Sequence, residues 1–216
     1  GDDYWTSPDK LQKQVDWLDR HPGHTMCFHE AEQLDAEGRL ERWSLAVPGR
    51  EEYGIEDILV RPPGFTCTCV YRRVLRRFPE WFPGLPFCDW PLQVLHAAEG
   101  PAGWLPDVMA VYRVRDAAAR ALGYDPAAGI TRAEFWAPWH AQVYEILNRH
   151  FDYRYDQVIR TELARVSREG QALRRLAAER SVTTRWIWSR LRRRPRLARV
   201  VVAMAGRVVG ALQGKR

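Results

Sequence analysis

Gly1-Asp2-Asp3-Tyr4-Trp5 opens the chain, and Thr6-Ser7-Pro8-Asp9-Lys10-Leu11-Gln12-Lys13-Gln14 follows it directly. Two adjacent carboxylates closed by two aromatic residues can hold a divalent cation, because hard cations such as Mg²⁺ and Mn²⁺ take oxygen ligands. Asp-Asp pairs are also common in exposed turns, so the pair alone leaves both interpretations open. The second stretch predicts a helix, since Ser7-Pro8-Asp9 is a typical helix start and apolar residues then repeat at helical spacing.

Two further blocks lie downstream of this segment. The first is Phe87-Cys88-Asp89-Trp90-Pro91-Leu92, and the second runs from Gly103-Trp104-Leu105-Pro106 to Val111-Tyr112-Arg113. In this order and spacing, the three blocks together resemble the family 2 glycosyltransferases, the inverting enzymes of GT-A fold. The resemblance covers roughly residues 1–115. It implies an α/β fold of GT-A type, in which helices flank a Rossmann-like mixed sheet.

The resemblance also implies an activity. Enzymes of this family transfer a sugar, with inversion, from a nucleotide-diphosphate sugar, and here the implied acceptor is a cell-envelope glycan or a lipid-linked molecule. Asp2 and Asp3 match the family's metal-binding segment, which implies Mn²⁺ or Mg²⁺ as the cofactor, and Asp2 falls on the last acidic position of its Asp-x-Asp motif. Asp89 matches the family's catalytic base.

The residue types suit this chemistry. The departing nucleotide diphosphate develops negative charge that a cation can neutralise, and the acceptor hydroxyl is a poor nucleophile until a carboxylate takes its proton. Asp89 equally fits an ordinary helix N-cap. Trp5 and Trp90 are interpreted as substrate-stacking residues or as core. Tyr112 and Arg113 either approach the diphosphate or, for Arg113, form a surface ion pair.

Some features depart from the family pattern. The Asp-Asp segment of the family lies in mid-domain, so we expect this chain to be a C-terminal half whose N-terminal nucleotide-binding half is missing, together with the glutamate expected before Gly1. Arg115-Asp116 stands where many relatives have a metal-site histidine, which leaves the third metal ligand open. Arg185-Trp186 resembles the end of the Gln-x-x-Arg-Trp motif of processive synthases, but Val182 replaces its glutamine. Addition of one sugar per encounter is therefore expected.

The chain divides into three predicted parts: the glycosyltransferase half at 1–115, a helical extension at 116–184, and a basic amphipathic tail at 185–216. In the extension, a capping-box pattern at Thr131-Arg132-Ala133-Glu134 begins the first of two helices, which we expect to form an antiparallel pair. Residues 181–216 hold ten basic residues and no acidic one, although the whole chain has a net charge of only +6. An anionic membrane surface is thus a predicted partner of residues 190–216, with a packed or disordered tail as the alternative.

Several negative predictions follow from the sequence. No nucleic acid is expected as a partner, because no recognisable nucleic-acid-binding fold accompanies the arginines. The longest apolar stretch, Val200 to Gly206, is too short to span a bilayer, so a cytoplasmic protein, peripheral on the inner face of the cell membrane, is expected. The oligomeric state stays open.

The cysteines and histidines are interpreted as structural. Cys27, Cys67, Cys69 and Cys88 lack the spacing of a zinc site and are expected to be packed, reduced thiols in a reducing compartment. The six histidines show no spacing typical of metal ligands. Locally, alternation predicts a strand at Phe65–Tyr71, and a short helix is expected at Arg72–Arg77.

A rival prediction comes from a different class of protein. The chain would then be a non-catalytic membrane-associated or scaffold module that retains a glycosyltransferase remnant. Gly-Asp-Asp also occurs at the metal site of viral RNA polymerases, but the helix after Asp9 and the Asp89 block do not belong there.

Overall fold

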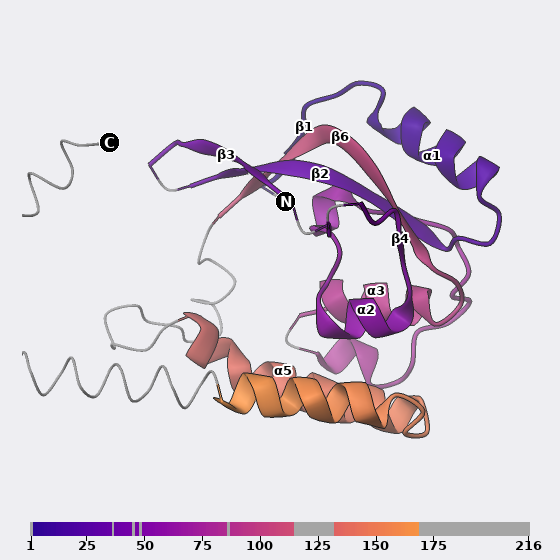
Figure 1. Cartoon of the computed structure of the whole chain (residues 1–216), viewed down its shortest axis with the longest axis vertical. Coiled ribbons are helices and arrows are strands. Elements are labelled where there is room, and N and C mark those ends of the chain that lie inside the picture. Colours follow the sequence, from indigo (N-terminus) through magenta and orange to yellow (C-terminus); the bar gives the residue numbers. More distant parts are fainter. Residues whose placement is uncertain are drawn as a thin grey trace, which may run out of the picture.

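The computed structural model describes residues 2–35, 37–44, 46–47, 49–85, 87–114 and 132–168. It shows a mixed α/β fold built on a six-stranded sheet (Figure 1). The strands of the sheet are β1 (Tyr4–Trp5), β2 (Met26–Leu34), β3 (Leu40–Trp43), β4 (Glu52–Tyr53), β5 (Val70–Tyr71) and β6 (Ala102–Arg113). The helices are α1 (Lys10–Arg20), α2 (Ile55–Val60), α3 (Asp89–Ala97), α5 (Arg132–His150), a helix over 156–168, and the 3-10 turns η1 (Thr66–Thr68) and η2 (Phe82–Gly84).

The long strands β2 and β6 form the centre of the sheet. These two strands run parallel to each other, and the strand order of the sheet is β1-β6-β2-β3. In addition, β4 pairs with β6 and β5 pairs with β2, in both cases antiparallel. Two parallel neighbours need a crossover connection, and here it carries α2 and α3 across one face of the sheet. The α/β architecture expected from the sequence is therefore confirmed.

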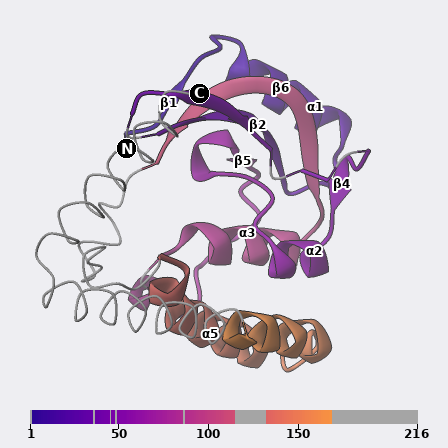
Figure 2. The same ribbon diagram turned by 60° about the vertical axis from the view of Figure 1, so that its left-hand side comes forward.

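Helices cover both faces of this sheet (Figures 1 and 2). Helix α1 packs on one face through Leu18, which joins Cys27 and Leu105 in a small buried cluster. Helices α2 and α3 cover the other face, and α5 with the helix over 156–168 forms a further layer outside them. One apolar core runs through these layers, made of Met26, Phe28, Tyr53, Ile58, Leu59, Trp90, Val94, Ala97, Ala102, Val143, Tyr144, Leu147 and Ile159.

The two C-terminal helices are an antiparallel pair, as expected. The chain turns at 151–155, where Asp152 and Tyr153 have positive φ angles, and the next helix returns beside α5 (Figure 2). Tyr144 anchors the pair to the rest of the fold, because its hydroxyl donates a hydrogen bond to the Leu59 carbonyl of α2 at 2.7 Å. The expected capping residue Thr131 and the basic tail lie outside the described residues.

Strand β6 is continuous although it contains Pro106. The pairing with β2 shifts register between His29 and Glu30, so that Leu105 and Val108 face consecutive β2 residues. Proline has no N–H to donate to a sheet, and a bulge is one of the few places where a strand tolerates it. The bulge also presents Asp107 to Lys13 of α1, with which it forms an ion pair.

Three local predictions were wrong. The segment Phe65–Tyr71 is a 3-10 turn with only Val70 and Tyr71 in a strand, and 72–77 is irregular. Arg72 is tied to the start of β2 instead, because its backbone N–H donates to Thr25 O at 2.7 Å and its Nε donates to His24 O at 2.9 Å. All four cysteines are free thiols, but Cys88 is exposed rather than packed, since it precedes the first turn of α3.

Candidate active site

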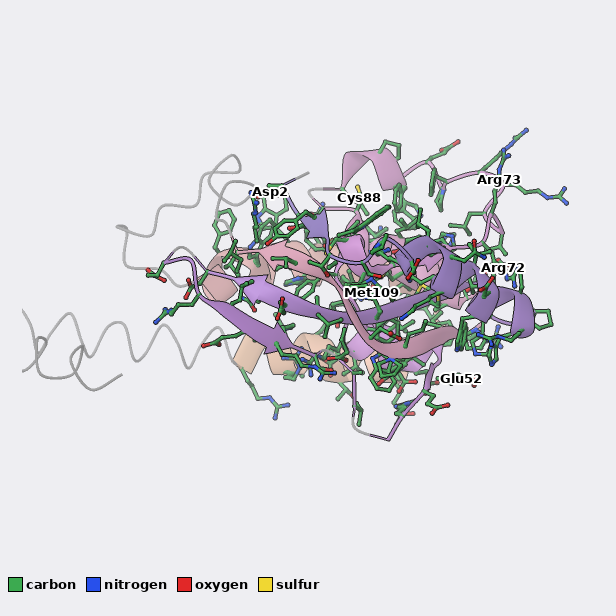
Figure 3. The ribbon with its side chains drawn as sticks, turned by 90° about the horizontal axis from the view of Figure 1, so that it is seen from above. Asp2, Glu52, Arg72, Arg73, Cys88 and Met109 are labelled. Atoms are coloured by element: carbon green, nitrogen blue, oxygen red, sulfur yellow. The ribbon has the colours of Figure 1, made fainter. Side chains whose placement is uncertain are left out.

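The Asp2-Asp3 segment lies beside the end of β6. Strand β1 pairs with β6 through Tyr4 and Val111, and this pairing brings the N-terminal carboxylates next to Arg113. Asp3 Oδ1 accepts a hydrogen bond from the Arg113 backbone N–H at 2.9 Å. Figure 3 shows Asp2 towards this end of the sheet and Glu52 towards the other. The site thus lies at the carboxyl ends of the parallel strands, where open α/β sheets bind ligands.

Arg113 brings a positive charge to these carboxylates. Its guanidinium lies over the Tyr4 ring, 5.0 Å from the ring centroid, and its Nε is buried without a hydrogen-bond partner among the described residues. A buried, unpaired guanidinium N–H is costly unless a ligand completes it. The surface ion pair that was the alternative for Arg113 is not seen among the described residues.

The same carboxylates fit a cation only in combination with a substrate. The described part of the chain contains no group of three His, Cys, Asp or Glu side chains placed to share a metal ion. Mg²⁺ is commonly held by one or two carboxylates plus substrate phosphates, with water in the remaining positions. Asp2, which is exposed, and Asp3, which is partly buried, match that arrangement and not an all-protein cage.

Asp89 is the first residue of α3, as the sequence indicated. Its side chain is exposed, and its Oδ1 accepts a hydrogen bond from the Trp90 backbone N–H at 2.9 Å. Cys88 occupies the N-cap position, so Asp89 lies in the first turn and not at the cap. The positive end of the helix dipole favours an ionised carboxylate at this place.

Helix α3 holds Asp89 rigidly because its following residues are buried. Trp90 is 6% exposed, and its Nε1–H donates to Ile58 O at 2.7 Å. One turn later, the Gln93 amide donates to Gly64 O at 2.8 Å. These two bonds fix the start of α3 to α2 and to the loop that follows α2.

Asp89, Trp90 and Tyr112 line one cavity of about 720 Å³. Three of the seven residues singled out in the sequence are therefore brought together, although 22 positions separate Trp90 from Tyr112. The remaining lining residues are Val60, Arg61, Pro62, Phe87, Trp136, His140, Tyr144, Arg165 and Val166. This volume lies within the range of pockets that bind small molecules, about 300–1,000 Å³.

The turn η1 and the residue after it carry two partly buried thiols, Cys67 and Cys69. Burial, with a further contribution from the Asp3 carboxylate, raises the pKa of the Cys67 thiol to about 12. Burial likewise raises the pKa of Cys69 to about 11, with a smaller contribution from Asp89. Asp3 thus contributes to the pKa shift of Cys67, and Asp89 to that of Cys69. Just before the turn, Phe65 stacks on Tyr112 with ring centroids 4.1 Å apart.

The two tryptophans differ in their environment. Trp90 is part of the core, in a T-shaped contact with Tyr144 at 4.8 Å between ring centroids, and it also lines the cavity. Trp5 is 53% exposed, and the Lys10 ammonium lies 4.5 Å from its ring centroid. Trp5 is not among the residues that line the cavity, so it belongs with the carboxylates at the end of β6.

Sequence reasoning missed the contribution of α5. Trp136, His140 and Tyr144 recur every four residues, which places them on one face of the helix, and this face lines the cavity. Burial lowers the pKa of His140, opposed by the Asp89 carboxylate and assisted by Arg165. The four-residue spacing of two aromatics around a histidine was the available signal, but the histidines were interpreted as structural.

Lys10 of α1 is a buried basic residue on the opposite face of the sheet from α2 and α3 (Figure 1). Lys10 is 1% exposed, and its ammonium donates to Gln14 Oε1 at 2.7 Å. Burial lowers the pKa of Lys10, while the three nearby thiols Cys69, Cys67 and Cys27 oppose this shift. Gln14 in turn donates to Thr68 O at 2.9 Å, so α1 is tied to the turn η1.

Comparisons with known proteins do not name an activity. No protein-family model matches the sequence. The chain is 37% identical over 136 residues to uncharacterized proteins of Mycobacterium bovis and Mycobacterium tuberculosis, and the match covers 63% of this chain. It spans 38% of the length of those relatives. Among the described residues, no helix combines the length and apolar character needed to cross a bilayer.

Proposed function

We propose that this chain takes part in transfer of a sugar from a nucleotide-diphosphate sugar to an acceptor hydroxyl, with inversion, as a glycosyltransferase of GT-A type. One observation carries the proposal. Tyr112 lines the cavity that contains Asp89, and the next residue, Arg113, holds Asp3 through its backbone N–H. The end of β6 thereby joins a carboxylate suited to a base with a cluster suited to a diphosphate.

The acceptor side of the reaction falls to Asp89. It is exposed, lines the cavity and lies in the first turn of α3, so its carboxylate is placed to take a proton from an acceptor hydroxyl. The hydrogen bond from the Trp90 N–H occupies Oδ1 and orients the group. The bonds of Trp90 and Gln93 then keep this orientation through the start of the helix.

The donor side falls to the end of β6. The Arg113 guanidinium, whose buried Nε has no hydrogen-bond partner within the described part of the chain, offers charge-assisted hydrogen bonds to a diphosphate. Asp2 and Asp3 would hold Mn²⁺ or Mg²⁺, which when bound supplies neutralisation of the charge that develops on the departing diphosphate. Trp5, which follows Asp2 and Asp3 in the sequence, is exposed and could pack against the sugar or the base of the donor.

The test measures sugar transfer by the intact protein with a panel of nucleotide-diphosphate sugars. Asp89→Asn should lower transfer at least about 100-fold, because general base catalysis typically contributes that much, while donor binding measured by calorimetry stays unchanged. Asp19→Asn is the matched control, since Asp19 is an exposed aspartate on α1.

Full transfer by Asp89→Asn would refute the role of Asp89. Absence of both donor binding and transfer in the wild-type protein would refute the glycosyltransferase proposal itself. That second result would favour the rival interpretation, a non-catalytic scaffold or membrane-associated module.

A further inference from the structure

Lys10 is a buried lysine that the proposed reaction does not use so far. Its side chain is 1% exposed, on the same face of α1 as the buried Leu18. No ion pair joins its ammonium to a carboxylate within the ranges that the structure describes. Burying an ammonium without a counterion costs free energy, so an apolar side chain of the same length would serve the fold at least as well.

Gln14 fixes the position of this ammonium. It is fully buried one turn further along α1, and its Nε2 donates hydrogen bonds to Thr68 O at 2.9 Å and to Cys27 O at 3.3 Å. The amide N–H groups are thus directed to backbone carbonyls of η1 and β2, which leaves Oε1 to accept from the Lys10 ammonium at 2.7 Å. One amide therefore ties the ammonium to both of these elements.

The ammonium also contacts the indole ring of Trp5. Lys10 Nζ lies over this ring, 4.5 Å from its centroid, which is the geometry of a cation–π contact. The backbone of Trp5 is held separately, because it pairs with Ala110 of β6. Trp5 is 53% exposed, so Lys10 covers one face of the ring while the rest of the side chain stays open to solvent.

We propose that Lys10 is a positioning residue whose ammonium holds the Trp5 ring from beneath, so that the open side of the ring forms a fixed platform for the donor. The inference rests on the proposed function for the identity of this ligand. Trp5 follows Asp3 by two positions, at the end of β6 where the diphosphate is expected to bind. A ring that is held before the ligand arrives loses less freedom on binding, and such preorganisation increases affinity.

The first measurement follows the Trp5 ring directly. The intact protein is labelled with 5-fluorotryptophan, and the fluorine resonance of Trp5 is identified by its absence from Trp5→Phe. In Lys10→Met, which keeps the side-chain length and removes the charge, this resonance should shift and narrow, because the ring is released. Lys10→Arg should restore the wild-type signal, since a guanidinium also lies well over an aromatic face. An unchanged Trp5 resonance in Lys10→Met overturns the inference.

The second measurement is a double-mutant cycle on donor binding, read by calorimetry. The probe is the nucleotide-diphosphate sugar of the panel that wild type binds most tightly, with Mn²⁺ present. Lys10→Met should weaken its binding about fivefold, in keeping with a partly desolvated cation–π contact. In a Trp5→Leu background the same change should alter binding by less than about twofold, because Lys10 acts through the ring. An equal loss in both backgrounds would show that the ammonium attracts the donor directly, which overturns the positioning role.

Lys13→Met is the matched control. Lys13 lies one turn from Lys10 on α1, but its ammonium is partly exposed and forms an ion pair with Asp107. The variant removes the same charge from the same helix, so it should leave the Trp5 resonance unchanged and donor binding within about twofold of wild type. A loss of donor binding equal to that of Lys10→Met would reduce the effect to net charge and overturn the inference.

The outcomes separate the inference from the proposed function. A wild-type protein that binds no donor of the panel counts against the glycosyltransferase, whereas the Trp5 resonance in Lys10→Met still decides whether the lysine holds the ring. Sugar transfer by wild type, together with an unchanged Trp5 resonance in Lys10→Met, supports the glycosyltransferase and overturns the inference.

Discussion

Gly64 offers a sharp test of how the loop after α2 is packed and how it holds α3. A Cβ at this position would lie 2.7 Å from Thr68 Oγ1 and 2.9 Å from Phe28 Cβ. Neither neighbour can retreat easily, because the Thr68 hydroxyl donates to Phe65 O at 2.8 Å and Phe28 is 1% exposed in the core. Gly64→Ala must therefore displace the loop that carries Phe65 and accepts the hydrogen bond of Gln93.

The expected cost follows from overpacking. Inserting one methyl group into a tight site typically costs about 1–3 kcal/mol. For a chain of this size each kcal/mol lowers the melting temperature by about 2–4 °C, so the expected drop is roughly 2–12 °C. Gly64 does not have a positive φ angle, so the loss would come from contact and not from backbone strain.

The assay is thermal unfolding of the intact protein, with Gly84→Ala as the control. A Cβ at Gly84 meets nothing within 4 Å, so this variant should unfold at the wild-type temperature or slightly above it, because alanine restricts the unfolded chain. A melting temperature equal to that of Gly84→Ala would refute this account of the packing at Gly64.

Two further predictions concern buried titratable groups. Burial lowers the pKa of His29 to about 4, below its ordinary value of 6.5, so its contribution to stability is lost as pH falls through that window. When the pH is lowered from 7 to 5, the unfolding free energy of wild type should therefore fall by about 1–2 kcal/mol more than that of His29→Leu, as measured by urea titration at each pH. An equal fall in the two proteins would contradict a buried neutral imidazole. Burial also lowers the pKa of Lys10, so the unfolded chain binds more protons below 10.5 and stability should rise with pH. Between pH 8 and pH 10 wild type should gain stability relative to Lys10→Met, and a flat difference would show that the ammonium is solvated.

Two helices could be predicted from local sequence. Helix α1 after Ser7-Pro8-Asp9 and the helix that begins at Asp89 both occur as expected. In each, the start signal and the hydrophobic period agree with the tertiary environment. In these elements, long-range packing therefore favours the same secondary structure as the local sequence.

The segment at 65–71 shows where local reasoning failed. Its alternating Thr and Cys residues have the pattern of a strand, but Phe65 stacks on Tyr112 and the Gln14 amide binds Thr68 O. These contacts come from residues distant in the chain, and they bend the segment into a 3-10 turn. Only Val70 and Tyr71 are left to pair with β2.

By itself, the sequence predicted the helix after Asp9 and a helix start at Asp89, since these depend on neighbours within a few residues, and its resemblance to a known family implied the α/β class. Only the tertiary structure decided which groups share a site. It joined Tyr112 to Asp89 across the cavity, held Asp3 at Arg113, and added His140 from a helix beyond the recognised blocks. Such contacts depend on the parallel pairing of β2 with β6 and on the packing of α5 against α2 and α3. No local pattern encodes the distance between segments that fold together from opposite ends of the chain.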